Sequence, residues 1–205
     1  MNLWRLLVMR DPDVAPHAAA FDALLAATPD GGDVDYDLPQ PKWWFLHHLV
    51  RGGYVLHGSN EQQIDEFRTR ENYDAHNVRR VEGVWASDDA IWPMYFAVVN
   101  RPVAQSYINW CEHVPGKSRY LFSIGSDPRD ARSWTDGTVY VLDAGPFEPT
   151  PGSRELVSRV PVRPRARIRI APEDFPFRGR TLGHRRGDTP NRVAIRNLLR
   201  LPGRR

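Results

Sequence analysis

Cysteine, lysine and long apolar runs are scarce in this chain of 205 residues. The one cysteine, Cys111, excludes an internal disulfide and a zinc site built on cysteines. No stretch approaches the ~20 apolar residues that span a bilayer, and the apolar part of residues 1–10 is too short and too interrupted for a secretory signal. The seven histidines have no metal-ligand spacing. We therefore expect a cytoplasmic protein with no membrane segment and no metal.

The positive charge is almost entirely arginine and is concentrated late in the chain. Of the 28 basic residues, only Lys42 and Lys117 are lysines. Residues 151–205 contain 15 arginines against four acidic residues, a net charge of +11, whereas the whole chain carries +3. Residues 1–150 therefore carry −8. This asymmetry predicts a basic face or tail on a mildly acidic body.

The pattern of apolar residues predicts helices early in the chain and short strands later. Helical spacing predicts helices over residues 15–27, 41–51 and 90–99. Short β-prone runs predict strands at residues 54–57, 81–86, 106–110, 120–124, 138–144, 155–162 and 167–170. We expect an edge strand or packing arm at residues 2–9, loops at 60–80 and 146–152, and a poorly ordered or weakly helical segment at 178–205. This order of elements is typical of the α+β class with a largely antiparallel sheet.

One predicted strand is flanked by glycines and ends at a histidine. Tyr54, Val55 and Leu56 form a β-prone run that stops at His57-Gly58. A strand end mounts a polar side chain rigidly, and an adjacent glycine lets a ligand approach the backbone. A histidine that only closes the strand and bonds a nearby carbonyl is the alternative interpretation.

Three motifs in a fixed order carry a family resemblance. His57-Gly58-Ser59 comes first, the run from Gly83 to Asp88 then leads into a helix with Tyr95, and Glu155 opens a late strand. Residues 53–170 thereby resemble the ADP-ribosyltransferase fold, in the His-Tyr-Glu branch of diphtheria toxin and the poly-ADP-ribose polymerases. The resemblance implies a split antiparallel β-sheet core with N-terminal helices. It suggests an N-terminal helical segment at 1–52, the core at 53–177 and a basic tail at 178–205.

The resemblance also implies NAD as substrate and assigns the binding residues. His57 would hydrogen-bond the adenosine-side ribose, backbone groups of Gly58 would hold the nicotinamide amide, and Ser59 would contact ribose. Trp85, where the family usually has tyrosine, and Tyr95 would stack on the nicotinamide ring. Both aromatics have a purely structural alternative as core residues.

Catalysis in the resemblance depends on Glu155, with His57 beside it. Cleaving the bond between nicotinamide and ribose passes through a positively charged, oxocarbenium-like sugar. Glu155 would bind the ribose 2′-hydroxyl and stabilise that charge. Glu148 and Glu173 compete for this role, but only Glu155 opens a predicted strand. A solvated carboxylate at a strand start is the alternative for Glu155.

Arginines alternate along residues 163–169, which would place them on one face of a strand. With four arginines that follow, they predict a phosphate-binding stripe for nucleic acid or another polyanion. The set is Arg163, Arg165, Arg167, Arg169, Arg178, Arg180, Arg185 and Arg186. Arg68, Arg70 and Asn72 form a second candidate group, over the NAD pyrophosphate. Solvated surface charge is the alternative for both groups.

The resemblance therefore implies an NAD-dependent ADP-ribosyltransferase or NAD glycohydrolase. The acceptor is not indicated, although the basic C-terminal face suggests nucleic acid or protein. Two other functions stay open: a non-catalytic nucleic-acid or protein binding module on the same fold, and an enzyme like the RNA 2′-phosphotransferases, which share the fold and use NAD as an acceptor.

Overall fold

The computed structural model describes residues 7–74, 79–150 and 155–185, together with 187–189, 191–193 and 195; of residues 72–74 and 79 it describes the backbone only. The chain forms two compact units whose segments interleave along the sequence. Unit 1 consists of Met1–Pro12, Val99–Thr135 and Pro176–Arg205, and unit 2 of Asp13–Val98 and Asp136–Phe175. The division at residues 52 and 177 depends on composition and family resemblance, whereas the units follow tertiary packing, so that division stays a prediction.

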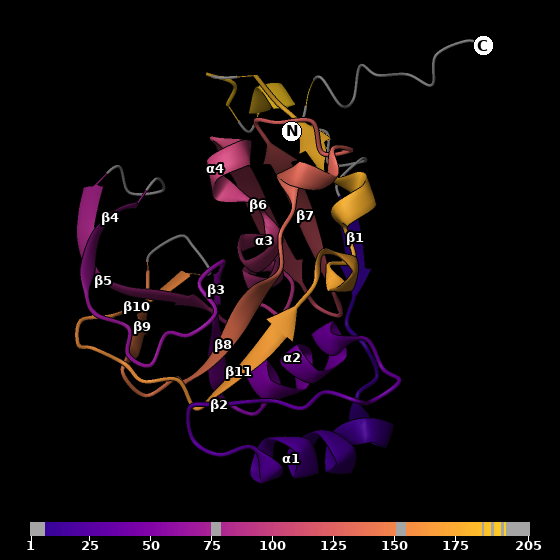
Figure 1. Cartoon of the computed structure of the whole chain (residues 1–205), viewed down its shortest axis with the longest axis vertical. Helices are drawn as coiled ribbons and strands as arrows, with labels where there is room; N and C mark the ends of the chain where they lie inside the picture. Colours follow the sequence, from indigo (N-terminus) through magenta and orange to yellow (C-terminus); the bar gives the residue numbers. More distant parts are fainter. Residues whose placement is uncertain are drawn as a thin grey trace. The chain divides into compact units, whose positions relative to one another are not determined.

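An eight-stranded sheet forms the centre of unit 2, in the order β2-β11-β8-β3-β5-β10-β9 with β4 paired to β5 (Figure 1). The strands are β2 Gly32–Asp33, β3 Tyr54–Ser59, β4 Arg70–Asp74, β5 Arg79–Ser87, β8 Gly137–Asp143, β9 Phe147–Pro149, β10 Glu155–Ser158 and β11 Ala166–Ile170. All these pairings are antiparallel except that of β2 with β11. The central strand β8 is buried from Gly137 to Leu142.

The sheet is split between β3 and β5. Strand β3 pairs with β8 along all six of its residues but with β5 only where Leu56 lies opposite Ser87. The first half of β5 pairs instead with β4, and its second half with β10. Strands β3 and β5 therefore diverge on either side of this one contact.

Two helices of unit 2 pack against each other in the lower part of Figure 1. Helix α1 (Ala18–Ala27) continues the 3-10 turn η2 (Ala15–His17), and α2 (Lys42–Arg51) begins after a proline. The buried rings of Phe21 and Phe45 lie 5.7 Å apart between them. A 2.7 Å contact between Asp22 and His48 closes the outer side of this pair.

Helix α3 (Trp92–Val98) packs directly on backbone, because two glycines lie beneath it. A Cβ atom at Gly58 would overlap the carbonyl oxygen of Pro93, and one at Gly137 would overlap that of Ala97. The buried carboxylate of Asp89 accepts hydrogen bonds from the backbone N–H groups of Ile91 and Trp92 at the start of α3. These features fix α3 on one face of β3 and β8.

Unit 1 contains a smaller sheet around β7 (Lys117–Ile124). Its other strands are β1 Leu7–Arg10, β6 Tyr107–Val114 and β12 Leu182–Gly183. Strands β1 and β6 pair antiparallel with β7, and β12 pairs parallel with it. The rings of Tyr120, Phe122 and Phe177 pack together within this unit. Its short helical elements are α4 Arg101–Ala104, η3 Ala131–Ser133 and η5 Arg178–Arg180.

The α+β class with split antiparallel sheets is confirmed, as are the three early helices and the seven predicted strands, apart from shifts at their ends. Three predictions about irregular regions were wrong. Residues 60–80 contain β4, residues 146–152 contain β9, and the segment that begins at residue 178 contains the strand β12, although its helical turn η5 agrees with the weak helix expected there. These strands are held by backbone pairing with a neighbour, which their charged or proline-rich sequences do not signal. Most of residues 186–205 lies outside the described part of the chain.

Candidate functional site

The structure brings the three sequence motifs onto adjacent strands of unit 2. His57 is on β3, Trp85 on β5 and Glu155 on β10, and β5 lies between the other two strands. Ser87 is the pairing partner of both Leu56 and Glu155, so these three residues form one row across the sheet. Segments separated by about a hundred residues in sequence therefore meet in space.

Trp85 and Glu155 share one face of the sheet. Glu155 is opposite Ser87, and Trp85 is two residues before Ser87, so both side chains project to the same side. Such diagonal neighbours have Cα atoms roughly 7 Å apart. Both residues are half-buried, and the Nε1 atom of Trp85 is shielded from solvent with no hydrogen-bond partner among the described residues. This face therefore presents an aromatic ring, an unused N–H donor and a carboxyl group together.

Helix α3 covers part of the same face. Gly58 is two residues from Leu56, which shares a row with Glu155, and the missing side chain of Gly58 is replaced by the backbone of α3. Gly58 is thus needed for helix packing whether or not its backbone also contacts a ligand. Ser59 is half-buried, and its hydroxyl oxygen accepts a hydrogen bond from the backbone N–H of Glu61 at 3.1 Å.

His57 lies at the split between β3 and β5. Regular alternation directs its side chain to the face opposite Glu155, where its ring lies 4.7 Å from that of Phe67. Its Nδ1 atom is 2.6 Å from the carbonyl oxygen of Trp85, and because a carbonyl only accepts, Nδ1 carries the proton. The carbonyl bond expected of a strand-closing histidine is confirmed. It also sets the tautomer, so that Nε2 of the neutral ring is an acceptor.

Tyr95 is completely buried, whereas its neighbour Phe96 is half-buried. The Tyr95 ring packs 5.8 Å from that of Phe175 and 5.7 Å from that of Phe96. A side chain with no exposed surface has to move before it can stack on a ligand. Phe96 is the more exposed of these two rings of α3, and the stacking role of Tyr95 stays a prediction. The sequence shows two adjacent aromatic residues in this helix, but which of the two is buried depends on tertiary packing.

The competing glutamates lie elsewhere. Glu148 is exposed on β9, opposite Val157, and is one strand farther from Trp85 than Glu155 is. Glu173 is in the 3-10 turn η4 (Pro172–Asp174), outside the sheet. Among the three, Glu155 alone is on the strand next to Trp85.

Carboxylates compensate the arginines of β11 and the loop before it. Arg163 lies 3.4 Å from Glu66, and Arg167 lies 3.4 Å from both Asp33 and Asp65. Arg169 also reaches Asp33, at 3.6 Å. The charges on this stripe are thus largely neutralised within unit 2, which weakens its attraction for a polyanion.

The later arginines belong to unit 1. Arg178 lies over the ring of Trp134 and Arg180 over that of Phe177, each 5.9 Å from the ring centroid. Arg185 is exposed, and Arg186 lies outside the described residues.

The loop group predicted to cover the pyrophosphate is exposed. Arg68 and Arg70 are both exposed, and Arg68 lies 3.7 Å from Glu66. The side chain of Asn72 is outside the described part of the structure.

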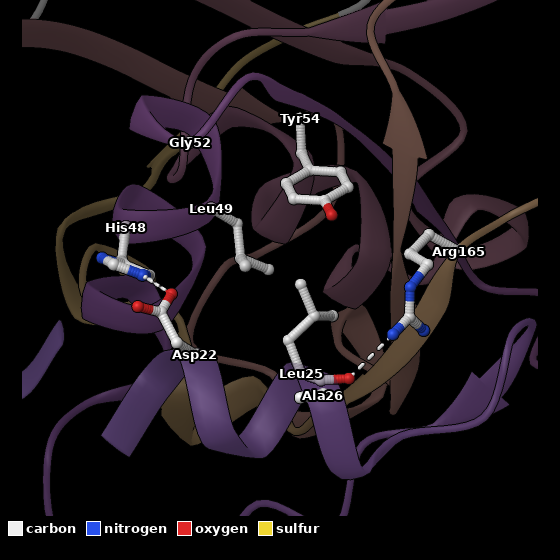
Figure 2. Close-up of a pocket in the computed structure, with 8 residues that line it drawn as sticks. All are labelled: Asp22, Leu25, Ala26, His48, Leu49, Gly52, Tyr54 and Arg165. Carbon is white, nitrogen blue, oxygen red and sulfur yellow. Dashed lines mark hydrogen bonds and ion pairs between the residues drawn. The ribbon is translucent and has the colours of Figure 1, made fainter. Parts of the chain in front are cut away.

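A pocket of about 320 Å³ opens between α1, α2 and the start of β3 (Figure 2). Leu25 and Leu49 supply its apolar wall, and the hydroxyl of Tyr54 points into it. Its charged groups are occupied: His48 bonds Asp22 at 2.7 Å, and Arg165 donates to the carbonyl oxygen of Leu25 at 2.9 Å. None of the predicted NAD-binding residues lines it.

The described residues contain no helix long and apolar enough to cross a membrane. In the same part of the chain, no group of three or more His, Cys, Asp or Glu is placed to hold a metal ion.

Comparison of the chain with models of protein families, with curated proteins and with solved structures finds no match.

Proposed function

We propose that this protein is an NAD-dependent ADP-ribosyltransferase, or an NAD glycohydrolase if water is the acceptor. The observation that carries the proposal is the row Leu56–Ser87–Glu155, which puts the three motifs of the resemblance on adjacent strands. A chance resemblance between short motifs does not require their strands to be neighbours.

The residues divide the chemistry between binding and charge stabilisation. The Trp85 indole would be a flat surface for the nicotinamide ring, and the second aromatic would come from α3, where Phe96 is more exposed than Tyr95. Glu155 is opposite Ser87, which is two residues after Trp85 on β5. Its carboxylate would bind the ribose 2′-hydroxyl and stabilise the positive charge that develops as nicotinamide leaves.

His57 would accept a hydrogen bond rather than transfer a proton. With Nδ1 donating to the Trp85 carbonyl, Nε2 is suited to accept from a ribose hydroxyl. The His57 side chain lies on the face opposite Glu155, beside the split between β3 and β5, so one NAD molecule would have to contact both faces at this split. Backbone groups of Gly58 and the Ser59 hydroxyl would complete the contacts to the amide and the ribose.

The decisive experiment measures nicotinamide release from NAD. Wild type should release it, and Glu155→Gln should reduce the rate about 10²- to 10³-fold with unchanged stability, because the amide keeps the shape but loses the charge. Glu148→Gln is the matched control, on the same face and one strand away, and should retain the rate.

Failure takes two forms. If wild type releases no nicotinamide and NAD does not raise its thermal midpoint, the NAD proposal is wrong and a binding module on this scaffold gains support. If both glutamine variants behave alike, the catalytic assignment of Glu155 is wrong although NAD cleavage stands. No specific observation favours an RNA 2′-phosphotransferase or a nucleic-acid module, since Arg163 and Arg167, in β11 and the loop before it, are paired with carboxylates.

A further inference from the structure

A chain of hydrogen bonds in unit 1 links two serines through a buried histidine. His184 follows β12 and is 8% exposed. Its Nε2 atom lies 2.9 Å from Oγ of Ser106, and its Nδ1 atom lies 2.8 Å from Oγ of Ser123. The hydroxyl of Ser123 donates onward to the carbonyl oxygen of Leu182 at 3.0 Å.

The direction of each bond follows from this last one. Ser123 has one proton and gives it to the Leu182 carbonyl, so toward His184 its oxygen accepts. Nδ1 of His184 is therefore protonated, and Nε2 of the neutral ring accepts from the hydroxyl of Ser106. The hydroxyl of Ser106 thus donates its proton to a base, His184, and Ser123 orients the ring of that base. This is the arrangement that activates a nucleophilic serine.

Two local features distinguish Ser106 from a serine whose only role is to hydrogen-bond a buried histidine. Ser106 is half-buried, whereas Ser123 is completely buried, so only Ser106 presents surface to a reagent. Gln105, immediately before it, has φ +58° and ψ −34°, a backbone conformation that costs a non-glycine residue about 1–3 kcal/mol. Strained turns of this kind often hold reactive side chains.

A glycine makes room for the Ser106 hydroxyl. A Cβ atom at Gly125 would lie 2.5 Å from Oγ of Ser106 and 2.7 Å from the carbonyl oxygen of Ala104. The backbone N–H of Gly125 also donates to the carbonyl oxygen of Ser106, at 2.9 Å. These contacts hold Ser106 in place against His184.

We propose that Ser106, His184 and Ser123 form a second reactive site, which transfers acyl groups from small carboxylic esters. Oγ of Ser106 attacks the ester carbonyl carbon while its proton moves to Nε2 of His184. The bond from that carbon to the alkoxy oxygen breaks, and the leaving alcohol takes the proton from Nε2. Water then attacks the acyl-serine by the same route, which releases the carboxylic acid and restores the Ser106 hydroxyl.

Ser123 is a positioning residue in this proposal, because it reaches the reaction only through His184. The proposal does not rest on the NAD chemistry of unit 2, and all three residues belong to unit 1.

The test is covalent labelling of the full-length chain with a fluorophosphonate probe, followed by mapping of the labelled residue. We expect one label per chain, on Ser106, and none in Ser106→Ala. Ser123→Ala should slow labelling about tenfold, and Ser123→Thr, which restores the hydroxyl, should recover it. Ser118→Ala is the matched control, because Ser118 contacts another histidine, His113, at 2.6 Å, and its loss should leave labelling unchanged.

The outcomes are distinct. An unlabelled wild type, or a label that survives Ser106→Ala, overturns the proposal. Equal labelling of wild type and Ser123→Ala overturns the positioning role. Hydrolysis of p-nitrophenyl acetate should follow the same order among the variants, while Glu155→Gln should label like wild type. Failure here thus leaves the NAD proposal standing, and the reverse also holds.

Discussion

The sequence predicts a functional role for two regions of unit 2, and in the structure these regions differ in how many of their polar groups already have partners. On the face that carries Trp85 and Glu155, both side chains are half-buried, and within the described part of the chain the indole N–H of Trp85 has no hydrogen-bond partner. On β11 and the loop before it, by contrast, the arginines contact carboxylates or backbone carbonyls of their own unit. The chemical type of a residue suggests what it can bind, but its existing partners decide whether it is still available to a ligand.

The largest expected effect separates packing from binding on the Trp85 face. Tyr95→Ala should lower the free energy of unfolding by about 3–5 kcal/mol, because a completely buried aromatic leaves a cavity. Phe96→Ala should cost only about 1 kcal/mol, yet weaken NAD binding about tenfold through lost stacking. Urea unfolding and NAD titration check both variants. The reverse pattern would return the stacking role to Tyr95.

The next effect concerns Gly58, for which the structure supplies a packing role. Gly58→Ala should cost about 3 kcal/mol, because α3 must shift away from the new methyl group. Gly145→Ala is the matched control in the same unit, since a Cβ there meets nothing within 4 Å. Urea midpoints compare the two. Equal midpoints would mean that α3 adjusts freely, and the close packing of α3 would then explain nothing about Gly58.

A smaller effect tests the arginine region. Arg165 donates to the carbonyl oxygens of Thr28 and Leu25 at the end of α1, and its side chain is 21% exposed. Arg165→Ala should cost about 1–3 kcal/mol, whereas Arg163→Ala, at 81% side-chain exposure, should cost less than about 0.5 kcal/mol. Thermal unfolding measures the difference. If Arg163→Ala instead abolished salt-sensitive binding of a polyanion, the stripe would regain its functional interpretation.

The smallest effect is a dependence on pH at the edge of the same region. Burial, with the negative charge of Asp174 as a lesser cause, raises the pKa of Tyr36 from 10.0 to about 12. The folded state then holds the phenol proton more tightly than the unfolded state, so stability should fall as pH rises from 10 to 12. Urea unfolding across this range should show a smaller fall for Tyr36→Phe. Parallel curves for both proteins would contradict the raised pKa.

Sequence patterns were sufficient to predict most of the helices and strands, but not all of them. The strand at Tyr54 and the helix at Lys42 have clear apolar periodicity and clear breakers, and both lie where the sequence predicts them. The strand Arg70–Asp74 was missed because its charged residues resemble a loop, and its pairing with β5 satisfies backbone groups regardless of side chain.

The candidate sites differ in the same way. His57, Trp85 and Glu155 each belong to a short sequence motif, and the motifs occur in the same order as in the family they resemble. The sequence alone was therefore enough to propose them as site residues. The bond between Ser106 and His184 joins residues 78 positions apart and has no local signal in the sequence. Burial also decides between Tyr95 and Phe96, and it depends on which segments pack over α3.

The interleaving of the two units has a consequence for synthesis on the ribosome. Unit 2 has all of its segments once Phe175 has emerged, whereas β7 must wait for β12 at Leu182–Gly183. The unit that contains β1 is therefore begun first and finished last, with the whole of the other unit produced in between. Nascent chains stalled after Phe175 should already bind NAD if the proposed site is right, while the serine–histidine pair awaits the last thirty residues.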